Sequence, residues 1–158
     1  MNNGIHFVLN GEEVCYEGNA SDRLLEVLRD TYHTISVKCG CKEGECGACA
    51  VLMDGLLVNS CCVAMGAVEQ ASIVTMESFR NTARYAVLDK AFAEVSAVQC
   101  GFCIPGMVLA AEALLAQHPH PTEEEIREGL SGNLCRCTGY NAIVNAVSIA
   151  AREGDGLW

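Results

Sequence analysis

Cysteine is the residue that most limits what this sequence can fold into. The chain has 11 cysteines among 158 residues, and the stretch CGCKEGECGAC, residues 39–49, holds 4 of them. The count is odd and the N-terminal segment has neither a basic region nor an apolar signal core, so we do not expect a disulfide framework. In a reducing compartment, clustered thiols more often bind metal. The sequence therefore predicts a cytoplasmic protein whose cysteines are metal ligands.

The first set of candidate ligands surrounds a glycine-rich loop. Its spacing is C-x4-C-x2-C with a fourth cysteine further along, and its members are Cys41, Cys46, Cys49 and Cys61. Plant-type ferredoxins use this spacing to hold a [2Fe–2S] cluster. Glycines at 40, 44 and 47 allow the tight bends that wrapping a cluster needs, and backbone N–H groups there can hydrogen-bond to the sulfurs. A four-thiolate zinc site is less favoured, because zinc prefers paired C-x2-C knuckles and this loop has a single one.

The second set lies in the C-terminal half and consists of Cys100, Cys103, Cys135 and Cys137. Its C-x2-C and C-x-C pairs each precede a predicted helix. The positive end of a helix dipole and its free N–H groups favour an anionic thiolate cluster. Cysteines one residue apart are an awkward pair for one tetrahedral ion but can serve a cluster of two irons. We therefore expect a second [2Fe–2S] cluster here.

The remaining cysteines and the paired histidines have simpler interpretations. Cys15 lies in a predicted strand and is expected to be a small core residue. Cys39 and Cys62 each lie close to a ligand, so they are alternative ligands or, as we favour, packing residues. His118 and His120 are expected in a loop between two helices rather than at a metal.

The N-terminal half is predicted to combine strands, turns and one helix. The expected elements are a hairpin at 4–16, a helix capped by Ser21 or Asp22 and running to about Tyr32, a hairpin at 48–60 and a strand at Ser72–Met76. The hairpin turns are Asn10-Gly11 and Asp54-Gly55, which are among the strongest short-range hairpin signals.

The C-terminal half has helical periodicity throughout. Helices are predicted over residues 83–95, 105–117, 122–130 and 138–153. Thr122 followed by Glu125 is a capping-box pattern, so the acidic run TEEEIRE is interpreted as a helix start and not as a catalytic carboxylate pair. The stretch MESFRNTA, residues 76–83, is expected to be the linker between the halves.

Three stretches of the sequence resemble the iron–sulfur small subunit of the molybdenum hydroxylase family. This family includes xanthine dehydrogenase, aldehyde oxidoreductase, aerobic-type carbon monoxide dehydrogenase and nicotinate dehydrogenase. The stretches are VKCGCKEGECGACAVLMDGLLVNSC, QCGFCIPGMVLAAEALL and GNLCRCTGYNAIVNAV. The resemblance extends over about residues 3–152 and includes all eight ligand positions in order.

The resemblance implies an α+β chain with an N-terminal β-grasp plant-type ferredoxin domain, residues 1–77, and a C-terminal four-helix domain, residues 78–158. It assigns the first cysteine set to the cluster nearer a flavin and the second to the cluster nearer molybdenum. It also implies that Gln99 and Cys137 lie against the molybdopterin. Ala50 and Ile104 replace threonines that are frequent in the family, which leaves the cluster potentials open.

The resemblance further implies partner subunits. A molybdopterin-binding large subunit and an FAD-binding medium subunit are expected in a hetero-oligomer, as a dimer of heteromers. The chain would then be the electron-transfer subunit of an oxidoreductase, with two [2Fe–2S] clusters and no catalytic residue of its own. The expected substrate of the assembly is an N-heteroaromatic compound of purine or nicotinate type, an aldehyde or carbon monoxide.

Composition narrows the remaining alternatives. The net charge of −10 argues against nucleic-acid binding, which needs a basic face, and the apolar runs are too short and interrupted to span a membrane. A free-standing two-cluster carrier that docks transiently remains an alternative to a permanent subunit. The mean hydropathy of +0.22 and the 19% of charged residues favour the subunit, because a permanent interface buries a large apolar face.

Overall fold

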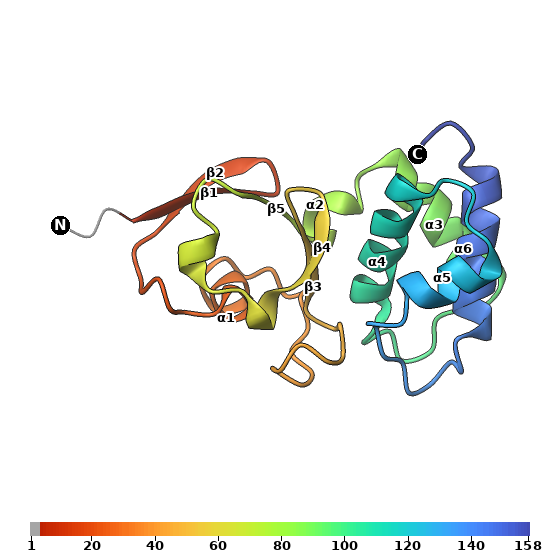
Figure 1. Ribbon diagram of the computed structural model, residues 1–158, viewed down its shortest axis with the longest axis horizontal. Coiled ribbons are helices and arrows are strands. Elements are labelled where there is room, and N and C mark those ends of the chain that lie inside the picture. Colours follow the sequence, from red (N-terminus) through yellow and green to blue (C-terminus); the bar gives the residue numbers. More distant parts are fainter. Residues whose placement is uncertain (1–3) are drawn as a thin grey trace.

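The computed structural model describes residues 4–158, which form a five-stranded sheet and six helices. The strands are β1 (Ile5–Leu9), β2 (Glu12–Tyr16), β3 (Ala50–Met53), β4 (Leu56–Asn59) and β5 (Ser72–Val74). The helices are α1 (Leu24–Glu26), α2 (Met76–Phe79), α3 (Ala83–Glu94), α4 (Ile104–Gln117), α5 (Glu123–Gly129) and α6 (Asn141–Glu153). The sheet and α1 lie on one side of the molecule and α3–α6 on the other, so the chain has the mixed composition that the sequence predicts (Figure 1).

The sheet is mixed, with strand order β2-β1-β5-β3-β4. β1 and β5 are parallel and the other neighbouring strands are antiparallel. Both predicted hairpins are confirmed: β1 and β2 turn at Asn10 and Gly11, with φ of 54° and 89°, and β3 and β4 turn at Asp54 and Gly55, with φ of 52° and 81°. Positive φ at both central residues matches the right-handed twist of the flanking strands, which is why Asn-Gly and Asp-Gly occupy these turns.

The prediction of one capped helix ending near Tyr32 is wrong in its details. α1 spans only three residues and continues as a π-helical turn, Val27–Thr31. Its N-cap is Arg23, and no side chain caps it. The Asp22 carboxylate instead accepts hydrogen bonds from the backbone N–H of Asn19 and the phenol of Tyr16, which holds the preceding turn.

The four predicted helices of the C-terminal half are confirmed, with ends shifted by a few residues. The Thr122 capping box is present, and Pro105 lies in the first turn of α4, where its missing N–H costs nothing. Residues 76–83 lie between the sheet half and the long helices, and part of this stretch folds as α2. The Phe79 side chain is buried in the helical core, where its ring packs edge-on against that of Tyr85.

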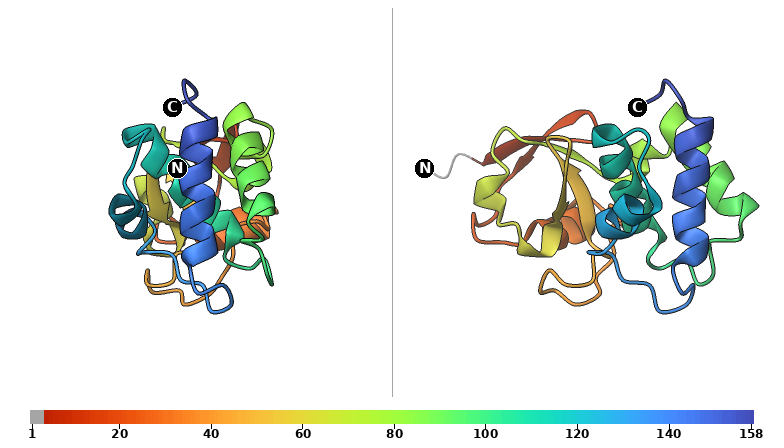
Figure 2. Two further views of the ribbon diagram at one scale, coloured as in Figure 1. Left: turned by 90° about the vertical axis from the view of Figure 1, so that its right-hand side faces the viewer. Right: turned by 45° about the vertical axis from the view of Figure 1, so that its right-hand side comes forward.

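Two hydrophobic cores form, one under the sheet and one among the helices. The sheet half and helices α3–α6 lie side by side in the further views (Figure 2). The sheet core includes Leu24, Leu28, Met65 and Ile73, and the helical core includes Leu88, Met107, Leu109, Ile143 and Val147. The cores adjoin at β3, since Leu52 of that strand packs into the helical cluster. The sheet half and the helical half are therefore in direct contact through β3, β4 and α4.

The C-terminus is held by a buried carboxylate. Glu112 of α4 is only 5% exposed and accepts hydrogen bonds from Arg84 Nη1 at 2.8 Å and Trp158 Nε1 at 2.7 Å. Arg84 also donates to the carbonyl of Leu157 at 2.7 Å. These contacts satisfy the buried charge and fix the last residues against α3 and α4.

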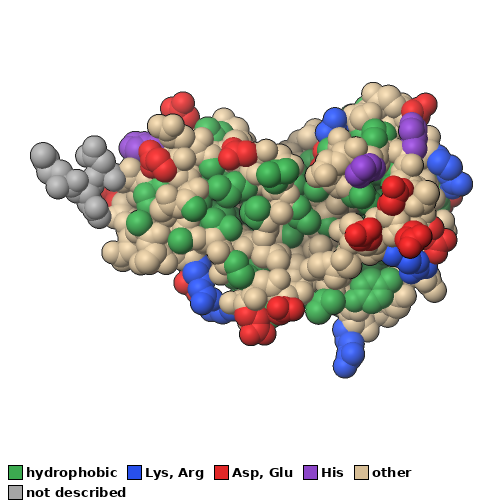
Figure 3. Space-filling view, in the orientation of Figure 1, with side chains coloured by type: hydrophobic (Ala, Val, Ile, Leu, Met, Phe, Trp, Pro, Cys, Tyr) green, Lys and Arg blue, Asp and Glu red, His purple; other side chains and the backbone are tan. Residues whose placement is uncertain are grey.

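Both polar and hydrophobic side chains reach the surface. On the side drawn in Figure 3, acidic side chains gather over the helical half and at the lower edge below the junction, and the surface is hollowed at the upper edge between the halves. Within residues 4–158, no helix is long and apolar enough to cross a membrane.

Candidate metal centres

The loop that carries the first thiol set is built from left-handed backbone turns. Lys42, Gly44 and Gly47 have φ of 63°, 82° and 67°, so the loop before β3 curls through the left-handed backbone conformation at three positions. This curl directs the backbone N–H groups of Glu43 and Cys46 at the Cys41 sulfur, each with a donor–acceptor distance of 3.4 Å. Backbone N–H groups of this glycine-rich loop therefore donate to at least one candidate ligand sulfur, as the sequence predicts.

The space beside the loop sulfurs depends on the absence of side chains. A Cβ atom at Gly40 would lie 2.6 Å from Cys46 Sγ, and one at Gly44 would lie 2.8 Å from Cys62 Sγ. Both distances are far inside van der Waals contact. The loop can thus approach the sulfurs only with glycine at these positions, which is the close backbone approach that a buried inorganic cluster requires.

The first set meets as two neighbouring pairs. The Cys41 and Cys46 side chains contact each other, as do those of Cys49 and Cys61. Hydrogen bonds from the backbone of Glu43 and Cys46 lower the pKa of Cys41 to about 7, whereas burial raises the pKa of Cys49 to about 11. A metal-bound thiol is deprotonated outright, so metal binding would hold both members as thiolates.

The second set also meets as two pairs, drawn from segments far apart in sequence. Cys137 Sγ and Cys100 Sγ are 3.6 Å apart, and the thiol of Cys103 contacts that of Cys135. Cys103 is the N-cap of α4, as predicted. The C-x-C pair does not lie at a helix terminus as expected, because α6 begins only at Asn141, after a turn of three further residues.

Burial and hydrogen bonding act in opposite directions within this second set. Burial, together with the neighbouring Cys135, raises the pKa of Cys103 to about 12. Burial also raises the pKa of Cys135, but the hydroxyl of Thr138 and the backbone N–H groups of Thr138 and Cys137 outweigh it and bring that pKa down to about 7. Like the first set, this one combines a readily ionised thiol with a buried one.

The arrangement in pairs fits a cluster better than a single ion. Among residues 4–158, no three His, Cys, Asp or Glu side chains converge on one point where a lone metal ion would sit. Each set instead meets as two pairs of thiols, and a [2Fe–2S] cluster needs two thiolates for each of its two irons. The four sulfurs, the N–H donors and the missing side chains at Gly40 and Gly44 therefore fit such a group.

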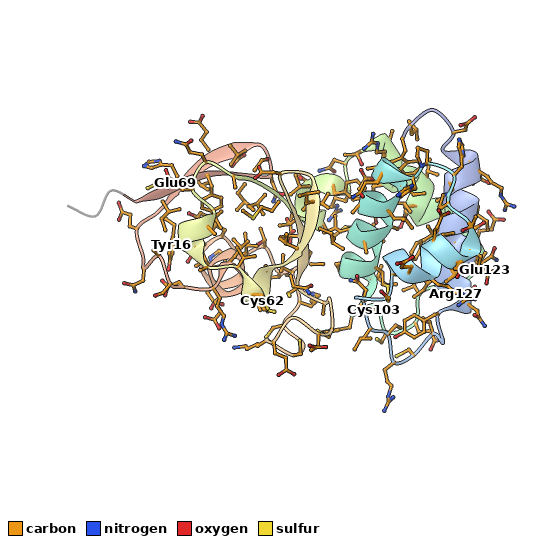
Figure 4. All side chains as sticks on the ribbon, viewed as in Figure 1. Tyr16, Cys62, Glu69, Cys103, Glu123 and Arg127 are labelled. Carbon is orange, nitrogen blue, oxygen red and sulfur yellow. The ribbon has the colours of Figure 1, made fainter. Side chains whose placement is uncertain are left out.

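The two sets are joined by hydrogen bonds that sequence reasoning did not find. The N–H of Leu134, the residue before Cys135, donates to the carbonyl of Cys46 at 2.9 Å. The buried side chain of Asn133 donates to the carbonyl of Gly47 at 3.0 Å. Both sets consequently lie at the same edge of the molecule, with Cys62 and Cys103 on either side of the junction (Figure 4). The sequence signal that could have pointed to Asn133 was its position two residues before the CRC motif.

The predicted minor cysteines are placed differently from expectation. Cys15, Cys39 and Cys62 are all exposed, so the packing interpretation is wrong for each. Cys15 lies on the outward face of the edge strand β2, since Val14 and Tyr16 take the inward positions. Cys62 is adjacent to the first set, with its sulfur 3.7 Å from Cys61 Sγ. His118 and His120 lie in the loop after α4, as expected.

Comparison with known proteins identifies the family. A family model described as a 2Fe-2S iron-sulfur cluster binding domain matches residues 13–91, and one described as a [2Fe-2S] binding domain matches residues 75–148. The small FeS subunit of nicotinate dehydrogenase from Eubacterium barkeri is 47% identical over 149 residues, covering 94% of this chain and 95% of the relative. The iron-sulfur-binding subunit of xanthine dehydrogenase from Escherichia coli O157:H7 is 43% identical, covering 90% and 91%. The chain belongs to the molybdenum hydroxylase family.

Solved structures from this molybdenum hydroxylase family have the same fold. Quinoline 2-oxidoreductase from Pseudomonas putida 86 has a chain that is 36% identical with a TM-score of 0.87, and the match covers 96% of each chain. Aldehyde oxidoreductase from Desulfovibrio desulfuricans is 38% identical with a TM-score of 0.90, covering 98% of this chain and 17% of the longer one. As an iron–sulfur subunit of such oxidoreductases, this member of the family supports electron transfer.

Proposed function

We propose that this chain is the electron-transfer subunit of a molybdenum-containing hydroxylase, and that it connects a molybdopterin site on one partner with a flavin on another. The observation that carries the proposal is that two sets of four thiols lie on segments joined by hydrogen bonds, from the Leu134 N–H to the Cys46 carbonyl and from the Asn133 side chain to the Gly47 carbonyl. When bound, two [2Fe–2S] clusters supply one-electron carriers at these sets.

The thiol pairs suggest how each set holds its irons. In the first set, Cys41 and Cys46 bind one iron and Cys49 and Cys61 bind the other. In the second set, Cys100 and Cys137 bind one iron, and Cys103 and Cys135 bind the other. The contacts within each pair support this assignment, since both thiolates of one iron must lie close together.

The junction supports electron exchange between the sets. A short path runs from Cys46 through its own carbonyl, across the 2.9 Å hydrogen bond to the N–H of Leu134, and along the backbone to Cys135. The buried side chain of Asn133 holds this path in place through its hydrogen bond to the Gly47 carbonyl. A Cβ at Gly106 of α4 would lie 2.4 Å from the same Gly47 carbonyl, so α4 also presses against the junction.

The exposed residues around the second set indicate which partner it meets. Gln99, Cys100 and Cys137 are exposed, and Gln99 offers an amide that can both donate to and accept from a pterin edge. Three large apolar side chains are exposed around these thiols, namely Val98 at 47%, Phe102 at 47% and Leu134 at 54%. Such a surface supports a permanent interface with the molybdopterin-binding large subunit. The first set then faces the FAD-binding medium subunit.

The finer organisation follows the same proposal. The N-terminal domain, residues 1–77, is a β-grasp ferredoxin domain, and residues 78–158 are a four-helix domain; the separate cores support this division. The assembly is cytoplasmic and a dimer of heteromers. Its substrate is an N-heteroaromatic compound, an aldehyde or carbon monoxide, and the relatives named for nicotinate and quinoline favour the first class.

Metal analysis of the native protein tests the proposal first. It should contain about four irons and four acid-labile sulfides per chain, and it should co-purify with larger subunits that carry molybdenum and flavin. Stoichiometric zinc without labile sulfide would overturn the assignment of clusters. A native protein that elutes alone at 16.9 kDa, with both clusters present, would overturn the assignment as a permanent subunit.

The order of the two sets has its own test. In a partly reduced complex, the EPR signal of the molybdenum centre should be split by a neighbouring reduced cluster. Cys103→Ser should remove this splitting and Cys46→Ser should leave it. Loss of the splitting only in Cys46→Ser would mean that the two sets are assigned in the wrong order.

A further inference from the structure

A ring of three hydrogen bonds encloses one thiol of the second set. The hydroxyl of Thr138 donates to Cys135 Sγ at 3.1 Å. The backbone N–H of Tyr140 donates to the Thr138 oxygen at 3.3 Å, and the backbone N–H of Cys135 donates to the phenol oxygen of Tyr140 at 2.9 Å. The ring therefore restrains both the sulfur and the backbone of Cys135.

The middle bond of the ring orients the hydroxyl. The N–H of Tyr140 occupies one lone pair of the Thr138 oxygen, so that oxygen acts as an acceptor on this side. Its proton is then directed to the other partner, the sulfur of Cys135. Thr138 is half-buried, which limits competition from water for this bond.

The backbone that closes the ring has an uncommon conformation. Gly139 and Tyr140 have φ of 67° and 69°, and for a bulky residue such as tyrosine this region is sparsely populated. The turn brings the phenol back to the N–H of Cys135. Backbone conformations of this kind persist where the surroundings hold them, and they concentrate at functional sites.

We propose that Thr138 and Tyr140 are positioning residues for the second thiol set. Thr138 raises the reduction potential of the group held there by donating to the Cys135 sulfur, and Tyr140 fixes the backbone of Cys135. A hydrogen bond to a ligand sulfur favours the reduced state, because that state places more negative charge on the sulfur. This inference rests on the proposed function, since it assumes that the second set holds a [2Fe–2S] cluster.

The first thiol set provides an internal reference. The donors to Cys41 Sγ are the backbone N–H groups of Glu43 and Cys46, which a substitution does not remove. The Thr138 hydroxyl acts only on the second set, because the bond it donates to sulfur reaches Cys135. A change at Thr138 should therefore shift one potential and leave the other in place within the same molecule.

Redox titration followed by EPR tests the role of Thr138 in the protein as isolated with its partners. The signal of the second set is the one that Cys103→Ser abolishes. In Thr138→Val, the ratio of oxidised to reduced second cluster at a fixed poise should rise about tenfold, which is a downward shift of about 59 mV for one electron. Thr138→Ser keeps the hydroxyl and should restore the wild-type ratio to within about threefold. The first cluster should be unchanged in both variants.

A second threonine separates a specific effect from general destabilisation. Thr82 caps α3, where its oxygen accepts from the N–H of Tyr85 at 3.1 Å, and none of its hydrogen bonds involves a sulfur. Thr82→Val should weaken the fold without shifting either potential. Equal shifts of both clusters in Thr138→Val, an unchanged second cluster, or the same shift in Thr82→Val would each overturn the role of Thr138.

Tyr140→Phe tests the other part of the ring. It keeps the aromatic ring and removes only the oxygen that accepts from the Cys135 N–H. The EPR signal of the second cluster should broaden while the iron content and the first signal stay the same. An unchanged second signal would overturn the role of Tyr140. If the wild-type protein shows zinc and no second [2Fe–2S] signal, the proposed function fails instead, and that outcome is distinguishable from an unshifted potential.

Discussion

The two thiol sets hold their sulfurs by different means. In the N-terminal set, two backbone N–H groups point at Cys41 Sγ and glycines keep side chains away. In the C-terminal set, Cys135 is hydrogen-bonded by backbone N–H groups and also by a side chain, the hydroxyl of Thr138. The difference teaches that one substitution can remove a donor to Cys135, whereas the backbone donors to Cys41 cannot be removed in this way.

The two thiol sets also share a pattern of pKa values. Each combines a thiol with a pKa of about 7, Cys41 or Cys135, with a buried thiol of much higher pKa, Cys49 or Cys103. Burial provides the low dielectric and the hydrogen-bonded partner provides a ready thiolate. Both sets therefore combine burial with hydrogen bonding, although one lies beside the sheet and the other among the helices.

The largest expected effect comes from adding one methyl group where the halves meet. A Cβ at Gly47 would lie 2.4 Å from the carbonyl of Gly132 and 2.6 Å from Asn133 Nδ2, and the φ of 67° disfavours a side chain. Gly47→Ala should lower the free energy of unfolding by about 2–5 kcal/mol, from backbone strain and overpacking together. Denaturant unfolding of the intact protein measures this.

Gly55→Ala is the matched control for that change. Gly55 also has positive φ, 81°, but no atom lies within 4 Å of its Cβ position. Its substitution should cost only the strain, about 1–2 kcal/mol. Equal losses in the two variants would mean that the contact between the halves contributes nothing.

The next effect tests the junction from the other side. Asn133→Ala removes the buried donor to the Gly47 carbonyl and leaves that oxygen without its partner. The free energy of unfolding should fall by about 1–3 kcal/mol. Asn145→Ala, on an exposed position of α6, should change it by less than about 0.5 kcal/mol. If Asn133→Ala also stays within that limit, the bond does not hold the halves together.

Glu77 should make the stability of the protein sensitive to acid. Burial raises the pKa of Glu77, but hydrogen bonds from Ser36 and Thr75 outweigh it, so the pKa lies below its ordinary value of 4.5. A depressed pKa in the folded state contributes stability that is fully present above pH 4.5 and is lost as the pH falls through the folded-state pKa.

Glu77→Gln measures this contribution. The free energy of unfolding at neutral pH should fall by about 1 kcal/mol, which is less than is usual for a hydrogen-bonded carboxylate because Glu77 is partly solvated. The gap between wild type and variant should narrow as the pH is lowered below 4.5. Glu17→Gln, at an exposed position, should show no gap at any pH. A Glu77→Gln gap that is constant with pH would contradict the assignment.

The smallest expected effect tests whether the thiol sets depend on the stability of a helix whose cap touches no cysteine. Thr122 caps α5 through a complete capping box that touches no cysteine. Thr122→Ala should cost about 1 kcal/mol, and Thr122→Ser should cost less because the hydroxyl remains. Iron content and both potentials should not change. Loss of iron in Thr122→Ala would show that the second set depends on the stability of the whole helical half.

Local sequence patterns determined much of this protein. The Asn-Gly and Asp-Gly pairs specified both hairpins, because few other residues tolerate two consecutive positive φ angles. Helical periodicity and the Thr122 box placed the four long helices. The cysteine spacing divided eight thiols into two sets, and the structure brings each set together as pairs. The hairpins and helices depend on residues close together in the chain, whereas the second thiol set joins residues 37 positions apart.

Tertiary structure decided the features that depend on distant residues. The Asn133–Gly47 bond joins residues 86 positions apart and the Ser36–Glu77 bond joins residues 41 apart. Sequence periodicity misplaced Cys15 in the core, because β2 became an edge strand with one face in solvent. It also missed the turn at Tyr140, whose positive φ is held by its hydrogen bonds to Cys135 and Thr138. The Asn133–Gly47 bond forms only when the two packed cores meet, since their surfaces must fit each other and no local pattern encodes that fit.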